Sequence, residues 1–115
     1  AKVSRLMSVH VADKVNEIIP DTQLVILCEE ELEANAMREY VNLAMEKTEG
    51  LCCAFSGNDS AGYRYLIGSR RMDVTSVAQT FARVFGAKGG GKPPMVQGAL
   101  SASIEEIREL LYGMV

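Results

Sequence analysis

The chain has 115 residues, of which 48% are hydrophobic and 23% are charged, and its formal net charge is −3. This length and balance are typical of one globular domain with a single core, and no apolar run reaches the ~20 residues that span a bilayer. A negative net charge argues against a protein that binds nucleic acid over its whole surface. We therefore expect a cytoplasmic protein with no membrane partner.

The first predicted element is a helix. Apolar residues recur at helical spacing from Lys2 to Ile19, and Pro20-Asp21 closes the segment. We expect residues 1–20 to form a connecting helix whose apolar stripe either packs on the domain or continues upstream, and residues 21–115 to form the main domain. The apolar run from Leu24 to Cys28 predicts a central strand that is buried on both faces.

The middle of the chain alternates helices and strands. An amphipathic helix is predicted from Leu32 to Gly50, after an acidic patch that favours the positive end of the helix dipole. Leu51 to Phe55 and Tyr63 to Gly68 are predicted strands, which a turn joins into a hairpin. Asp73 is a suitable N-cap for a helix that ends at Phe85.

The last elements complete an α/β pattern. Val96 to Ser101 predicts a short strand, and Ser103 with Glu106 forms the capping box of a final helix. The order of elements predicts an α/β fold: a single domain with a small sheet flanked by helices and a Gly-rich loop between a helix and the last strand.

That predicted loop, Gly86 to Gly98, reads GAKGGGKPPMVQG and is unlike an ordinary core element. Gly89 to Gly91 expose backbone N–H groups and permit positive φ, which favours a nest that accepts an anion, and Lys88 and Lys92 add charge on either side. The segment also fits the first seven positions of a P-loop, but Pro93 stands where a hydroxyl residue is required. This argues against hydrolysis of a nucleoside triphosphate.

Charge is unevenly distributed along the chain. Cys28 to Gly50 holds seven Glu against two cations, whereas Ala61 to Leu100 holds six cations against Asp73 alone. If the two segments fold to opposite sides, the molecule has one acidic face and one basic face. We expect a phosphate-bearing partner to bind the basic face, to which the glycine-rich segment belongs.

Catalytic and metal-binding residues are sparse. Cys28, Cys52 and Cys53 make a poor disulfide framework and a poor zinc site, so we expect buried, reduced thiols. The only histidine, His10, has no second type of metal ligand near it in the sequence. We therefore expect no catalytic residue, no metal and no cofactor in this chain.

The glycine-rich segment resembles the signature of the DHH-associated domain, the C-terminal module of alanyl-tRNA synthetases and of freestanding alanyl-tRNA editing proteins. The resemblance extends from about Leu24 to the C-terminus, and Phe55 to Ser69 is similar to the hairpin of the editing proteins. Ala87 and Ala99 stand where glycine is common in the family. The matching residues are Gly86, Lys88, Gly89, Gly90, Gly91, Lys92, Pro93, Gln97 and Gly98.

The resemblance implies a module that binds tRNA, gripping its outer corner, while another domain of the same parent chain performs the chemistry. That parent would be a zinc-dependent aminoacyl-tRNA deacylase or an alanyl-tRNA synthetase, with zinc on the catalytic domain and none in this fragment, which would not itself be an enzyme. Arg70-Arg71 would widen the basic patch. The nucleic-acid-binding residues that we expect are Lys88, Gly89, Gly90, Gly91, Lys92, Gln97 and Arg83.

Two alternatives remain open. The same type of domain follows the catalytic domain of DHH-family phosphoesterases, where its glycines help to bind the substrate phosphate. Those members commonly carry His after the glycines, and Lys92-Pro93 at this place favours the alanyl-tRNA side. The other alternative is a homodimerisation module, built from the apolar stripe of Lys2 to Ile19 and the helix around Met37 and Met45.

Overall fold

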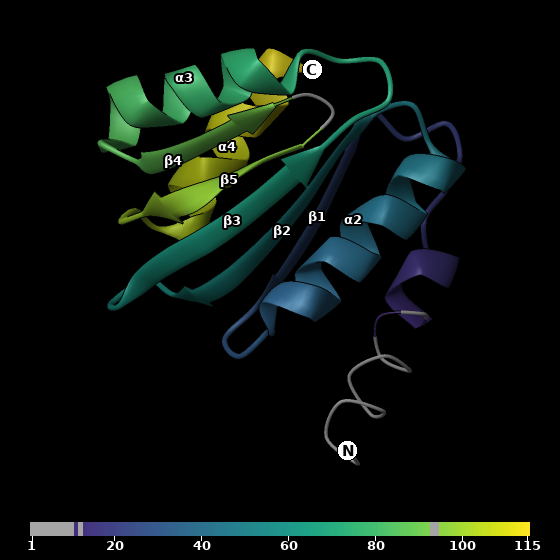
Figure 1. The fold of residues 1–115 in the computed structure, drawn as a ribbon, viewed down its shortest axis with the longest axis horizontal. Helices are drawn as coiled ribbons and strands as arrows, with labels where there is room; N and C mark the ends of the chain where they lie inside the picture. The colour runs from purple at the N-terminus through teal and green to yellow at the C-terminus, as the bar shows by residue number, and fades with distance from the viewer. Residues whose placement is uncertain (1–10, 12, 93–94) are drawn as a thin grey trace.

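A computed structural model describes residues 11, 13–92 and 95–115, which form one five-stranded mixed sheet with helices on both faces (Figure 1). The strand order is β1-β2-β3-β5-β4, with β1 parallel to β2 and the other neighbours antiparallel. The strands are β1 Leu24–Glu29, β2 Leu51–Asn58, β3 Gly62–Gly68, β4 Lys88–Lys92 and β5 Met95–Leu100. The helices are α2 Ala34–Lys47, α3 Val74–Phe85 and α4 Ile104–Met114. The α/β fold class predicted from the sequence is therefore confirmed.

Each face of the sheet has its own core. Alternating strand residues point to opposite faces, so Ala54 and Leu66 pack with α2, while Phe55 and Ile67 pack with α3 and α4. Phe81 of α3 is fully buried in the second core. Figure 1 shows α2 with the described N-terminal segment on one face, while α3 and α4 share the other.

The described part of the N-terminal segment packs on the α2 side. Residues 13–16 are helical, and Val11, Val15 and Ile18 are buried with α2. The Lys47 ammonium donates a hydrogen bond to the Val15 carbonyl at 3.1 Å. The apolar stripe predicted here therefore contacts the domain where it is described. Residues 1–10, with His10, and residue 12 lie outside the described residues, and a domain boundary at residue 20 stays a prediction.

Several local predictions are confirmed. The Asp73 carboxylate accepts hydrogen bonds from the first-turn N–H groups of α3, and Ser103 and Glu106 form the predicted capping box of α4. The predicted hairpin is formed by β2 and β3. One prediction is wrong, because β1 is an edge strand and not a central one. The strand is apolar because helices cover both faces of the sheet, and at this edge they cover β1 as well.

The three cysteines are free thiols. Cys52 and Cys53 are fully buried, and burial raises the pKa of the Cys52 thiol to about 12 and that of Cys53 well above its ordinary value. Cys28 is half-buried, so the expectation of buried, reduced thiols is met in full only by the adjacent pair.

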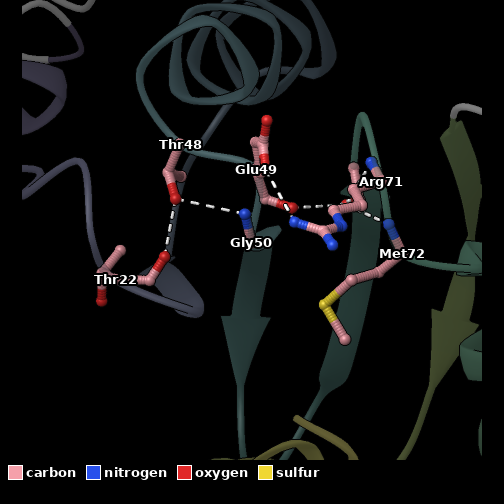
Figure 2. Close-up of polar contacts among 7 residues, drawn as sticks. Thr22, Thr48, Glu49, Gly50, Arg71 and Met72 are labelled. Carbon is pink, nitrogen blue, oxygen red and sulfur yellow. Dashed lines mark hydrogen bonds and ion pairs between the residues drawn. The ribbon is translucent and has the colours of Figure 1, made fainter.

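A small polar network joins the connections at one end of the sheet (Figure 2). The buried Thr48 hydroxyl donates to the Thr22 carbonyl at 2.6 Å and accepts from the Gly50 N–H at 3.1 Å. It thereby ties the end of α2 to the segment that precedes β1. Both backbone groups depend on this one side chain within the network.

Replacing Thr48 with valine should reduce the free energy of unfolding by about 1–2 kcal/mol, because the change leaves the Thr22 carbonyl and the Gly50 N–H without their partner. Urea denaturation measures the effect. Thr80→Val is the matched control, since the Thr80 hydroxyl only donates to the Ser76 carbonyl on an exposed part of α3. Equal losses in the two variants would contradict this account of the network.

Asp59 connects the β2–β3 turn to α4. Its carboxylate accepts a hydrogen bond from the Tyr63 hydroxyl at 2.6 Å and one from the Ile104 N–H at 3.0 Å. These two bonds hold the pKa of Asp59 below its ordinary value of 3.8. Because the folded-state pKa is the lower one, the contribution to stability is present above pH 3.8 and is lost as the pH falls through the lowered pKa.

Acidification should therefore reduce the free energy of unfolding, and protonation of Asp59 should account for part of that loss. Urea midpoints measured between neutral and strongly acidic pH should fall less steeply for Asp59→Asn than for the unmodified chain. The two curves should converge at the acidic end, where Asp59 is protonated in both folded and unfolded states. Parallel curves across the whole range would show that this carboxylate is not linked to folding.

Candidate nucleic-acid interface

The candidate interface starts with a row of residues that crosses three strands. Arg64 of β3 lies opposite Ala99 of β5, and Ala99 lies opposite Lys88 of β4. Directly paired residues point to the same face of a sheet, and this is the α2 face. Since α2 packs on β2 and β3, this row remains exposed beside it.

A second row lies two residues further along the same strands. Leu66, Gln97 and Gly90 are paired across β3, β5 and β4, and Gln97 and Gly90 are exposed. The two rows and the first turns of α2 enclose a groove of about 660 Å³. Its lining residues include Asn35, Arg38, Arg64, Lys88, Gly89, Gly90, Gln97 and Ala99.

The groove is strongly basic. Arg38, Arg64 and Lys88 all line it and are exposed, and no carboxylate in the described ranges forms an ion pair with any of them. In a chain with a net charge of −3, three such cations on one groove create a local positive potential. The groove can therefore attract and hold an anion through charge-assisted hydrogen bonds.

The glycines are required by close packing of β4 against β5. Gly89 has φ 140° and Gly91 has φ 154°, which are values that residues with side chains rarely adopt. A Cβ on Gly89 would overlap the Gln97 carbonyl, and one on Gly91 would approach the Met95 carbonyl to 2.9 Å. Gly90 between them has open space where a Cβ would lie.

The glycines therefore do not form the predicted anion-binding nest. The segment lies between α3 and the last strand, as expected, but Lys88–Lys92 is an extended edge strand paired with β5. Because the glycines carry no side chains, they leave a shallow stretch of backbone between Lys88 and the end of the strand. A ligand can approach that backbone closely.

A family model for the DHHA1 domain matches residues 21–114. The chain belongs to the DHHA1 domain family. The resemblance to a DHH-associated domain, seen in the sequence at Gly86 to Gly98, is thus confirmed. No curated protein matches the chain at a significant level.

This DHHA1 domain has the fold of a solved domain of a tRNA synthetase. It superimposes on the C-Ala domain of alanyl-tRNA synthetase from Aquifex aeolicus with a TM-score of 0.61 and 20% sequence identity. The match covers 83% of this chain and 96% of the C-Ala domain. At this identity the similarity establishes a common fold.

The DHHA1 domain brings only some of the predicted site residues together. Lys88, Gly89, Gly90 and Gln97 line the groove. Of the remaining three predicted residues, Gly91 and Arg83 do not line it, and for Lys92 the groove is not a test, because its side chain is outside the described part of the chain.

These three residues have different positions. Gly91 and Lys92 continue β4, and the side chain of Lys92 and residues 93–94 lie outside the described part of the chain. Arg83 is exposed in the last turn of α3, on the opposite face of the sheet. Its part in binding stays a prediction.

Arg71 does not extend the groove of the DHHA1 domain. Its guanidinium donates to the Glu49 carboxylate at 3.1 Å, and its backbone N–H donates to the Ser69 hydroxyl at 3.2 Å (Figure 2). The Ser69 hydroxyl also accepts from the Met72 N–H and donates to the Glu49 carbonyl. Arg71 therefore belongs to the polar network at the end of the sheet.

Arg38 and Arg64 are the groove residues that sequence reasoning missed. A signal for Arg64 was present, because it lies between Tyr63 and Tyr65 and must point away from the core that buries them. Arg38 belongs to the acidic segment, and only the placement of α2 beside β3 reveals that it lines the groove. Residues of both oppositely charged segments line this groove, although α3 of the basic segment lies on the other face of the sheet.

The described residues of this DHHA1 domain contain no group of three or more His, Cys, Asp or Glu side chains arranged to hold a metal ion. In the same ranges, no helix has the length and apolar character needed to cross a membrane.

Proposed function

We propose that this domain binds tRNA through the basic groove between α2 and the β3, β5 and β4 strands. The observation that carries the proposal is the row of Arg64, Ala99 and Lys88, which places two cations on the exposed half of the sheet, with no ion pair to either among the described residues. Lysine and arginine contacts to phosphates supply the main affinity for nucleic acids. Membership of the DHHA1 family and the C-Ala fold support the same function.

The groove suits a folded RNA bound through its backbone. Arg64 and Lys88 bind phosphates, the glycine strand lets the ribose-phosphate chain come close, and the Gln97 amide donates or accepts at a sugar hydroxyl. Tyr65, the aromatic residue at the groove, is only 2% exposed, so it offers no face for base stacking. This composition favours recognition of RNA shape over sequence.

We further propose that the domain is the C-terminal module of an alanyl-tRNA synthetase-related editing protein in the cytoplasm. In such a parent, a zinc-bearing catalytic domain would hydrolyse mischarged tRNA, and this domain would position the substrate. The described residues of the groove contain cations, amides and glycines but no pair of nucleophile and base. That composition supports a division between binding in this domain and chemistry in the proposed catalytic domain.

NMR mapping tests the proposal, because a domain of 12.5 kDa gives resolved amide signals. Adding alanine tRNA to the ¹⁵N-labelled domain should shift or broaden the amides of Arg64, Lys88, Gly90 and Gln97. Amides of α4, which lies on the other face, serve as the internal control. Changes confined to α3 and α4, or no changes, would exclude this groove as the binding site.

One observation favours the phosphoesterase alternative. The groove volume of about 660 Å³ lies within the range of small-ligand sites. If adenosine monophosphate shifts the same amides and tRNA does not, the domain binds a nucleotide substrate as in DHH-family phosphoesterases. The homodimer alternative has lost part of its support, because Met37 and Met45 are buried in the α2-side core.

A further inference from the structure

The second wall of the groove is formed by the first turns of α2. Ala36, Met37, Tyr40 and Val41 form the buried stripe of this helix. Met37 is 3% exposed and fixes the wall against the sheet, while the adjacent Arg38 is exposed and lines the groove. The wall is therefore rigidly placed and carries one cation.

The neighbours of Arg38 leave its charge available. Positions three and four residues away on the helix hold Ala34, Asn35, Val41 and Asn42, so no carboxylate occupies the places where a helical ion pair forms. The carboxylates before α2, among them Glu31 and Glu33, do not line the groove. Arg38 lines the same groove as Arg64 and Lys88, but it comes from the helix, whereas they come from the sheet.

We propose that the groove holds one ribose-phosphate strand between these two walls, with Arg38 binding one phosphate and Arg64 and Lys88 binding its neighbours. The proposal rests on the proposed function and extends it, because it assigns a phosphate contact to a helix outside the glycine-rich segment. A groove of about 660 Å³ is the size of a small-ligand site, so it accommodates a short stretch of a single strand of the folded RNA.

The salt dependence of tRNA binding tests whether Arg38 contacts a phosphate. Fluorescence anisotropy with labelled alanine tRNA transcript, between about 50 and 200 mM KCl, gives the slope of log K against log salt. Arg38→Gln should reduce the magnitude of that slope by about 0.7–0.9 and weaken binding roughly four- to five-fold near 0.15 M salt, as expected for one lost phosphate contact. Arg38→Lys retains the charge and should retain the slope.

Arg108→Gln is the matched control. Arg108 is also an exposed arginine on a helix, but α4 covers the opposite face of the sheet, and Arg108 does not line the groove. Glutamine is a good helix former at both positions, and circular dichroism checks that both variants are folded. Arg108→Gln should leave slope and affinity close to those of the unmodified chain.

The outcomes separate this proposal from the proposed function. Suppose that Arg64→Gln with Lys88→Gln weakens binding, but Arg38→Gln behaves like Arg108→Gln. The groove then remains the binding site, and the proposed phosphate contact of Arg38 is wrong. If the unmodified domain does not bind tRNA, the proposed function fails and this inference fails with it.

Discussion

Replacing Arg64 and Lys88 together by glutamine should weaken tRNA binding roughly 10- to 30-fold near 0.15 M salt. Both residues lie in one row across β3, β5 and β4, and no described carboxylate pairs with either. Each phosphate contact contributes about 0.7–0.9 to the slope of log K against log salt, so the double variant should lose about twice that amount.

Anisotropy titrations at several salt concentrations measure this effect. Lys14→Gln with Arg108→Gln is a control with the same change of charge, because neither residue lines the groove. If binding depended only on the total charge of the molecule, the two double variants would lose equal affinity. If tRNA binds in the groove, only the variant with Arg64→Gln and Lys88→Gln should lose affinity.

Substituting Gly89 by alanine should destabilise the domain by roughly 2–3 kcal/mol, because an alanine at φ 140° is strained and its Cβ overlaps the Gln97 carbonyl. The corresponding fall in Tm is roughly 10 °C for a domain of this size. Since β4 must move to relieve the overlap, Lys88 would leave the row, and tRNA binding should fall as well.

Gly90→Ala is the matched control for stability. Gly90 lies in the same strand, one residue away, but its φ is not positive, and a Cβ there would meet no atom within 4 Å. The free energy of unfolding of Gly90→Ala should differ from that of the unmodified chain by no more than about 0.5 kcal/mol, as is common for surface substitutions. Its Tm should therefore change little. Thermal unfolding followed by circular dichroism compares the two. A similar fall for both variants would mean that β4 is not held against β5 as described.

Local chemistry made much of the fold predictable. Asp73 and the pair Ser103 and Glu106 marked two helix starts correctly, because side-chain caps act within a few residues of the backbone they satisfy. The hairpin of β2 and β3 also followed from its turn and its two apolar runs. These signals are short in range and need no knowledge of distant partners.

Predictions that depend on distant partners were less reliable. The apolar run of β1 indicated burial on both faces but gave no information about its place at the sheet edge. Gly89 to Gly91 are typical of turns, yet pairing with β5 makes them a strand. In both cases the result depends on which strand becomes the neighbour, and a local pattern contains no record of that.

The candidate site was predictable to the extent that it lies in one segment. The family motif supplied Lys88, Gly89, Gly90 and Gln97, which the hairpin of β4 and β5 brings to one groove. Arg64 joins them only through the β3–β5 register. Arg38 joins them only because α2 packs on β2 and β3, with its first turns beside the groove.

The most direct test of the central claim is a fluorescence titration of this domain with whole alanine tRNA and with an acceptor-stem minihelix that lacks the tRNA corner, each at low and high salt. The account predicts tighter binding to the whole tRNA and a marked loss of affinity as salt increases, because the contacts are made to phosphates. Absence of binding to either RNA, or binding that is unaffected by salt, would contradict it.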